Sequence, residues 1–109
     1  MSINKIIIDA LMSLDVPVAF MNYTGTENKY ITFFKYNEQG TLRADDKERR
    51  LRHSIQVDVW GDGDIETLTQ QVKITLQAIG FERVSFFEDY EQETKTYHKA
   101  YRFYYEEAI

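Results

Sequence analysis

The chain has 109 residues, of which 43% are hydrophobic, 28% charged and 15% aromatic, and these values predict one globular domain with one core. A net charge of −5 at pH 7 argues against nucleic acid as a principal partner, because binding a phosphate backbone requires a dominant basic surface. The absence of cysteine excludes disulfides and thiolate metal sites, and suits a reducing cytoplasm. The apolar run near the N-terminus is interrupted at Asp9, so we expect neither an export signal nor a membrane span.

The first third of the chain predicts a helix followed by two strands. Apolar residues recur at helical spacing from Ile3 to Leu14, Ser2 is suited to cap the first turn, and Pro17 closes the segment. Residues 18–23 and 30–36 have the composition of strands, and the polar residues 24–29 separate them. We therefore expect these two strands to form a hairpin.

The middle of the chain predicts a polar connection, a strand and a second helix. Residues 37–47 have little apolar content and no period, so we expect a loop of about ten residues there. Residues 49–60 alternate between apolar and polar side chains, which is the clearest strand pattern in the chain. Asp62 and Asp64 are suited to cap a helix that ends at Gly80. The expected buried stripe of this helix is Ile65, Leu68, Val72, Leu76 and Ile79.

Two aromatic-rich segments, residues 81–89 and 97–107, predict a closing hairpin. The element order is therefore α-β-β-β-α-β-β. This order indicates an α+β single domain over residues 1–109, with a mostly antiparallel twisted sheet and two helices packed on one face. The last strand carries aromatic residues on both faces, as at Tyr101 and Tyr104. An apolar second face suits an interface, so the sequence predicts self-association.

The sequence predicts no catalytic, cofactor or metal site. The serines lack a nucleophile-elbow motif, and His53 and His98 lie on separate strands without the spacing of metal ligands. The acidic cluster between Asp58 and Glu66 is better explained by helix capping and the helix dipole than by a bound cation. Two other classes of protein stay open as alternatives, namely a small-molecule-binding α+β domain and a metal-dependent hydrolase that uses this acidic cluster.

Charged residues gather in two segments that are suited to contact between copies. A basic segment leads into the strand at residues 49–60, and an acidic segment lies at residues 88–93. One interpretation is that the basic segment of one copy contacts the acidic segment of the next copy, which joins two unlike surfaces. The other is that each segment is a charged surface exposed to solvent. With two tyrosines of the last strand, the predicted interface residues are Arg43, Asp45, Asp46, Lys47, Arg49, Arg50, Arg52, Glu88, Asp89, Glu91, Glu93, Tyr101 and Tyr105.

Several short patterns occur in an order that is typical of one family. Residues 55–60 read IQVDVW, a helix follows, and Gly80-Phe81 comes directly after it. The later residues of the pattern are Asp89, Tyr90, Glu91, Thr94, Tyr97, His98, Lys99, Arg102 and Phe103. Over nearly its whole length the chain resembles the tail-terminator, or tail-completion, proteins of long-tailed bacteriophages and prophages.

The resemblance implies a non-enzymatic virion assembly protein without a cofactor. Such a subunit forms a ring, typically a hexamer, at the end of the tail tube, where it ends tube polymerisation and forms the joint to the head. The implied partners are further copies of the chain, the tail tube protein, and a head-tail connector or head-closure protein. The implied location is the virion tail, after synthesis in the cytoplasm of the host bacterium. A head-closure or minor tail role is the alternative within this class.

Overall fold

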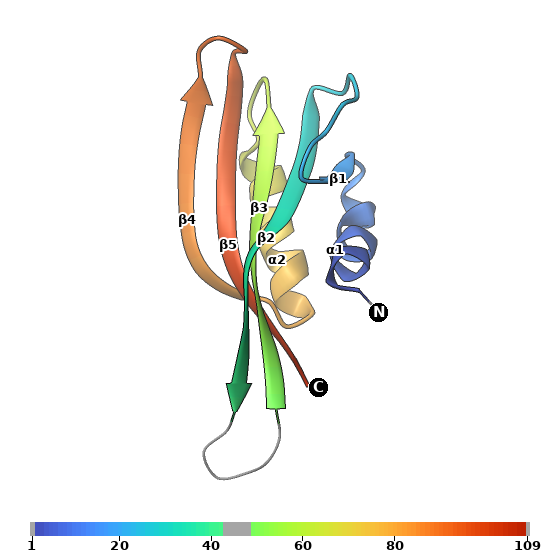
Figure 1. The fold of residues 1–109 in the computed structure, drawn as a ribbon. Helices are drawn as coiled ribbons and strands as arrows, with labels where there is room; N and C mark the ends of the chain where they lie inside the picture. The colour runs from blue at the N-terminus through green and yellow to red at the C-terminus, as the bar shows by residue number, and fades with distance from the viewer. Residues whose placement is uncertain (1, 43–48, 109) are drawn as a thin grey trace.

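A computed structural model describes residues 2–42 and 49–108. A five-stranded sheet is backed by two helices, and its strand order is β1-β2-β3-β5-β4 (Figure 1). The elements in chain order are α1 (Ile3–Leu11), a 3-10 turn (Met12–Leu14), β1 (Val18–Phe20), β2 (Lys29–Leu42), β3 (Arg49–Gly61), α2 (Glu66–Ala78), β4 (Glu82–Glu91) and β5 (Thr96–Ala108). The predicted α+β class, the element order and the mostly antiparallel sheet are confirmed.

Helix α1 begins and ends where local chemistry requires. The Ser2 hydroxyl accepts a hydrogen bond from the backbone N–H of Lys5 at 3.2 Å, which satisfies one donor of the first turn. Ile7 and Leu11 share one face and are fully buried against the sheet. After the 3-10 turn, Asp15 adopts a left-handed conformation with φ of 65°, which ends the helical segment before β1.

Helix α2 buries the predicted apolar stripe from Ile65 to Leu76, but Ile79, its last predicted member, is 41% exposed. The helix also begins differently from the prediction. Its N-cap is Ile65, which offers no side-chain cap, and the Asp64 carboxylate instead accepts a hydrogen bond from the N–H of Glu66 at 2.9 Å. The expected cap by Asp62 does not form, because the helix begins too far along the chain for it to reach the first turn. Gly80 terminates the helix with φ of +103°, a conformation that favours glycine.

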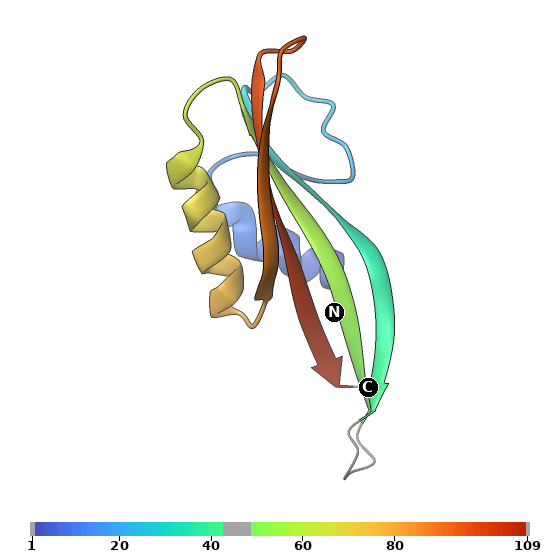
Figure 2. The same cartoon turned by 90° about the vertical axis from the view of Figure 1, so that its left-hand side faces the viewer.

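The core lies between the helices and one face of the sheet. Alternate residues of the central strands point toward the helices, and the register aligns Phe33 with Val57 and Ile55 with Phe103. These four side chains are fully buried. Figure 2 shows α2 on one side of the sheet, which leaves the opposite face of the central strands without a helix.

The expected hairpin of the first two strands is wrong, because β1 and β2 are parallel. The parallel pair extends only from Val18 opposite Ile31 to Phe20 opposite Phe33. Met21 turns the chain with φ of 65°, and residues 21–28 then return it to the start of β2. Eight residues span up to about 26 Å, which is enough to return along a strand of only three residues.

The expected loop at residues 37–47 is also wrong in part, since β2 continues to Leu42. After a register shift between Lys35 and Asn37, the pairing with β3 resumes at Asn37 opposite Ser54 and runs to Leu42 opposite Arg49. This part of β2 projects beyond the helices (Figure 1), so neither face needs an apolar set of side chains. A strand of that kind carries no alternating pattern. The rest of the expected loop lies outside the described residues.

Candidate interaction surface

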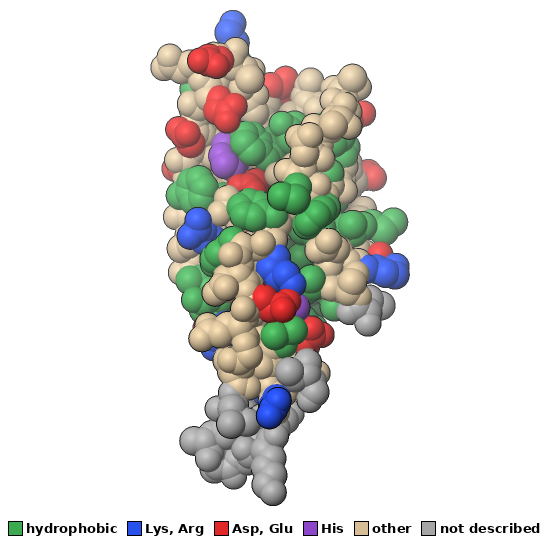
Figure 3. Space-filling model, viewed as in Figure 1, with side chains coloured by type: hydrophobic (Ala, Val, Ile, Leu, Met, Phe, Trp, Pro, Cys, Tyr) green, Lys and Arg blue, Asp and Glu red, His purple; other side chains and the backbone are tan. Residues whose placement is uncertain are grey.

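The helix-free face of the sheet carries a row of rings that crosses four strands and the loop after β1. Tyr23 stacks on Tyr30 with ring centroids 4.5 Å apart, and Tyr30 lies 6.0 Å from Trp60. The indole of Trp60 is parallel to the His98 ring at 3.8 Å, and Phe87 meets His98 edge to face at 5.5 Å. Figure 3 shows this face, where a band of hydrophobic side chains crosses the sheet and charged side chains lie around it. The predicted aromatic content of the second face is present, but polar groups interrupt it.

A hydrogen-bonded polar network lies beside the row of rings. Asp58 is only 4% exposed, although no helix covers it. Its Oδ1 accepts hydrogen bonds from His98 Nε2 at 2.7 Å and from Gln56 Nε2 at 2.8 Å. The Gln56 carbonyl accepts from Arg102 Nε at 3.1 Å, and the Arg102 guanidinium lies over the Tyr36 ring at 4.7 Å. The network satisfies these polar groups and holds the face in one arrangement.

Both histidines act as strand-to-strand contacts in the structure. His53 is buried, its Nε2 donates to Glu107 Oε1 at 2.7 Å, and Lys35 Nζ lies 3.5 Å from its Nδ1. Lys35 also pairs with Glu38, and that hydrogen bond lowers the pKa of the Glu38 carboxyl. Over residues 2–42 and 49–108, no group of three or more His, Asp or Glu side chains is arranged to hold a metal ion. Asp58 of the suspected acidic cluster belongs to the network described above.

Strand β4 forms one edge of the sheet and is exposed along its whole length. Val84, Phe86, Phe87 and Tyr90 are large apolar residues that each remain at least 39% exposed. Tyr97 of β5 is 46% exposed and its ring lies 4.7 Å from that of Tyr90. An exposed edge strand with this content is a template for association with another strand.

The predicted acidic residues lie at one end of the β4–β5 hairpin. Glu88, Asp89 and Glu91 are on β4, and Glu93 is in the turn that follows. Beside them lies an open depression of about 630 Å³ that is lined by Asp62, Gly63, Asp64, Ile65, Glu88, Asp89, Tyr90, Tyr97 and Lys99. Lys99 pairs with Glu66 and lies 3.6 Å from Glu88. The hydrogen bond with Glu66 raises the pKa of Lys99 and lowers that of Glu66.

The predicted basic residues that the structure describes lie at the other end of the sheet. Arg49, Arg50 and Arg52 are on β3, where Arg50 aligns with Ala108 near the end of β5. Arg52 Nη2 contacts Glu106 Oε1 at 2.8 Å, and this hydrogen bond raises the pKa of the guanidinium. The basic and acidic segments are therefore far apart in one chain, and their pairing between copies stays a prediction. Arg43, Asp45, Asp46 and Lys47 lie outside the described residues.

The two tyrosines of the predicted interface lie on the helix-covered face. Tyr101 is only 3% exposed and belongs to the core. Burial raises the pKa of its hydroxyl. Tyr105 is half-buried and stacks on Phe81 with centroids 4.6 Å apart. Their role in subunit contact stays a prediction, which the burial of Tyr101 does not favour.

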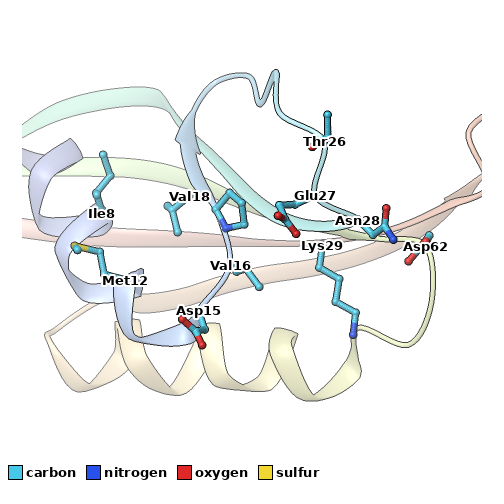
Figure 4. Close-up of a pocket in the computed structure, with 11 residues that line it drawn as sticks. Ile8, Met12, Asp15, Val16, Val18, Thr26, Glu27, Asn28, Lys29 and Asp62 are labelled. Carbon is cyan, nitrogen blue, oxygen red and sulfur yellow. The ribbon is translucent and has the colours of Figure 1, made fainter.

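A second open depression, of about 740 Å³, is formed by segments that are distant in sequence (Figure 4). Ile8, Met12, Val16 and Val18 supply its apolar lining from α1 to β1. Its polar groups come from the neighbouring loops and from the first residue of β2, and they are Asp15, Thr26, Glu27, Asn28, Lys29 and Asp62. Sequence reasoning missed this depression, because no local pattern connects the segments that form it.

Comparison with known proteins shows a similarity of fold. Over 92% of its length the chain superposes with a TM-score of 0.60 on a chain of the virion of a native gene transfer agent particle, covering 84% of that chain. The two sequences are 9% identical, so the likeness concerns the fold. No protein-family model matches the sequence, and neither does any curated protein. Within the described residues, no helix is long and apolar enough to cross a membrane.

Proposed function

We propose that this chain is a structural subunit of a virion, and that its copies form a ring at the end of a phage tail tube. The observation that carries the proposal is the fold likeness, over 92% of the chain, to a chain that is part of an assembled virion. The tail-terminator pattern at residues 55–60 and 80–103 supports the finer role. In that role the ring stops tube polymerisation and presents a surface to a head-tail connector or head-closure protein.

The surface chemistry supports assembly over catalysis. The polar groups of the helix-free face are engaged with one another, as Asp58 is with His98 and Gln56. The large apolar side chains of β4, in contrast, each stay at least 39% exposed, although the rings of Phe86, Phe87 and Tyr90 contact rings of β5. Unlike patches on one protomer, such as the acidic hairpin and the basic end of β3, generate a heterologous interface when they meet on adjacent copies. A rotation that closes such an interface produces a ring.

Assembly of the purified chain tests this proposal. Light scattering over a range of concentrations should give a particle mass that is a fixed multiple of the protomer mass, and electron microscopy should show rings. Mixing with the tail tube protein of the same phage or prophage should increase the fraction of rings, because the tube end provides a template. A chain that stays monomeric at all concentrations, with and without tubes, contradicts the proposal.

The same mixtures separate the neighbouring roles. A terminator binds tube ends and limits tube length, whereas a head-closure protein binds the connector and leaves tube length unchanged. A minor tail protein binds along or below the tube without limiting its growth. The distribution of tube lengths, with and without the chain, therefore distinguishes the terminator from both alternatives.

A further inference from the structure

We propose that adjacent copies join edge to edge, with β4 of one copy pairing antiparallel with residues 34–42 of β2 in the next. The sheet then continues from copy to copy around the assembly. This inference rests on the proposed assembly of identical copies, and it specifies which backbone edges meet. It does not depend on the charge pairing predicted from the sequence.

The first edge belongs to β4. Among the strands that the structure describes, β4 (Glu82–Glu91) pairs with β5 alone, and all ten of its residues are exposed. The register shift between Arg83 and Ser85 is confined to the start of the strand. From Ser85 to Glu91 the pairing is regular, so seven consecutive residues present an even row of outward backbone groups.

The second edge belongs to β2. Strand β1 covers β2 only from Ile31 to Phe33. Beyond Phe33, residues 34–42 pair with β3 on one side except at Tyr36, where the register shifts, and the pairing is regular from Asn37 to Leu42. None of the residues that the structure describes forms a strand on the other side. This stretch has nine residues, which is close in length to β4.

The strand directions of the two edges are compatible. Strands β4 and β3 are both antiparallel to β5, and β2 is antiparallel to β3. When two copies stand in the same orientation, β4 of one is therefore antiparallel to β2 of the other. The sheet continues without inverting either copy, as a heterologous ring requires.

The pairing needs a stagger along the strands. Within one copy, Glu82 of β4 is opposite Tyr104 of β5, Tyr104 is opposite Ser54 of β3, and Ser54 is opposite Asn37 of β2. Glu82 and Asn37 therefore lie at the same position along the strand direction. Placing most of β4 beside residues 34–42 therefore requires a shift of roughly six residues per copy, and closed sheets of tilted strands have such a stagger. An even shift keeps the helix-covered faces of both copies on the same side.

Charge favours β2 over a second β4 as the partner. Strand β4 carries four carboxylates and one arginine, so two β4 strands repel each other. Residues 34–42 carry only Lys35 and Glu38, which pair with each other. Arg49 and Arg50 lie one strand further in, opposite Leu42 and Thr41. The edges therefore select head-to-tail contact and disfavour a closed dimer.

Cysteine cross-linking tests the inference, because the chain has no cysteine of its own. Phe87→Cys should be combined in turn with Asn37→Cys, Gln39→Cys and Thr41→Cys, which occupy one face of β2 at successive two-residue steps. At the correct register the paired Cα atoms lie within disulfide range. We expect one of the three pairs to give a ladder of covalent multimers on oxidation. Phe87→Cys with Gln77→Cys, on the exposed surface of α2, is the matched control and should give none.

The outcomes separate this inference from the proposed function. Rings that form without any of the three cross-links overturn the edge pairing and leave the ring assembly standing. A dimer from Phe87→Cys alone, in place of the ladder, also overturns it, because that result shows β4 against β4. Failure of every variant and of the unmodified chain to form rings contradicts the proposed function itself.

Discussion

Replacement of Asp58 by alanine should destabilise the fold through the polar network on the helix-free face. The carboxylate is 4% exposed and accepts hydrogen bonds from His98 at 2.7 Å and from Gln56 at 2.8 Å. Alanine removes both acceptor contacts and leaves two donors directed at an apolar methyl group. The imidazole that stacks on Trp60 at 3.8 Å then loses the group that orients it.

The expected loss follows from the two hydrogen bonds. Each bond to a charged group contributes about 1.5–3 kcal/mol, and each donor left without a partner costs a comparable amount. Because the face is open, water reaches part of the site, so we expect the free energy of unfolding to fall by about 3 kcal/mol. A domain of this size has a total of roughly 5–15 kcal/mol, so the variant should still fold.

Urea denaturation, followed by the fluorescence of Trp60, measures this loss, since Trp60 is the single tryptophan of the chain and lies beside the site. The unfolding midpoint of Asp58→Ala should fall by roughly 1–2 M urea. Asp58→Asn is the matched control, because it keeps an oxygen acceptor of the same shape, and it should lose less than Asp58→Ala. A change below about 0.5 kcal/mol in Asp58→Ala refutes the structural role assigned to the network.

Three further variants test the core, a turn and an ion pair. Phe103→Ala removes a fully buried ring and should lower the free energy of unfolding, measured by chemical denaturation, by about 3–5 kcal/mol. A loss as small as that of a substitution at an exposed position contradicts the place of Phe103 in the core. Gly80→Ala forces a side chain into φ of +103° and should lower the thermal midpoint; an unchanged midpoint refutes the strain. Lys99→Gln should reduce stability between about pH 4.3 and pH 10.4, because the pair lowers the pKa of Glu66 and raises that of Lys99. The difference from wild type should shrink as pH falls through the lowered pKa of Glu66, and a constant difference contradicts the pairing.

The sequence predicted those elements whose side chains divide between an apolar face in the core and a polar face. The alternation at residues 49–60 persists because β3 is central and one of its faces is the core. The apolar stripe of α2 likewise predicted Leu68, Val72 and Leu76 as buried residues. In both cases one apolar core face requires a period that is visible in the sequence.

The errors fall where no such requirement exists. Residues 37–42 form a strand that projects beyond the helices, so polar side chains are tolerated on both faces. The direction of β1 depends on the backbone turn at Met21 and on the length of the returning loop, which composition does not encode. The contact of Asp58 with His98 joins residues that are 40 positions apart, and only the register of β3 with β5 brings them together.

Electron microscopy of tail tubes tests the central claim most directly. Tube protein of the same phage or prophage is allowed to polymerise with and without this chain, and tube ends and lengths are recorded. Ring assembly at the tube end predicts one additional ring of density at a single end and a narrower distribution of shorter tubes. Bare tube ends with unchanged lengths, at concentrations where the chain is folded, contradict the claim.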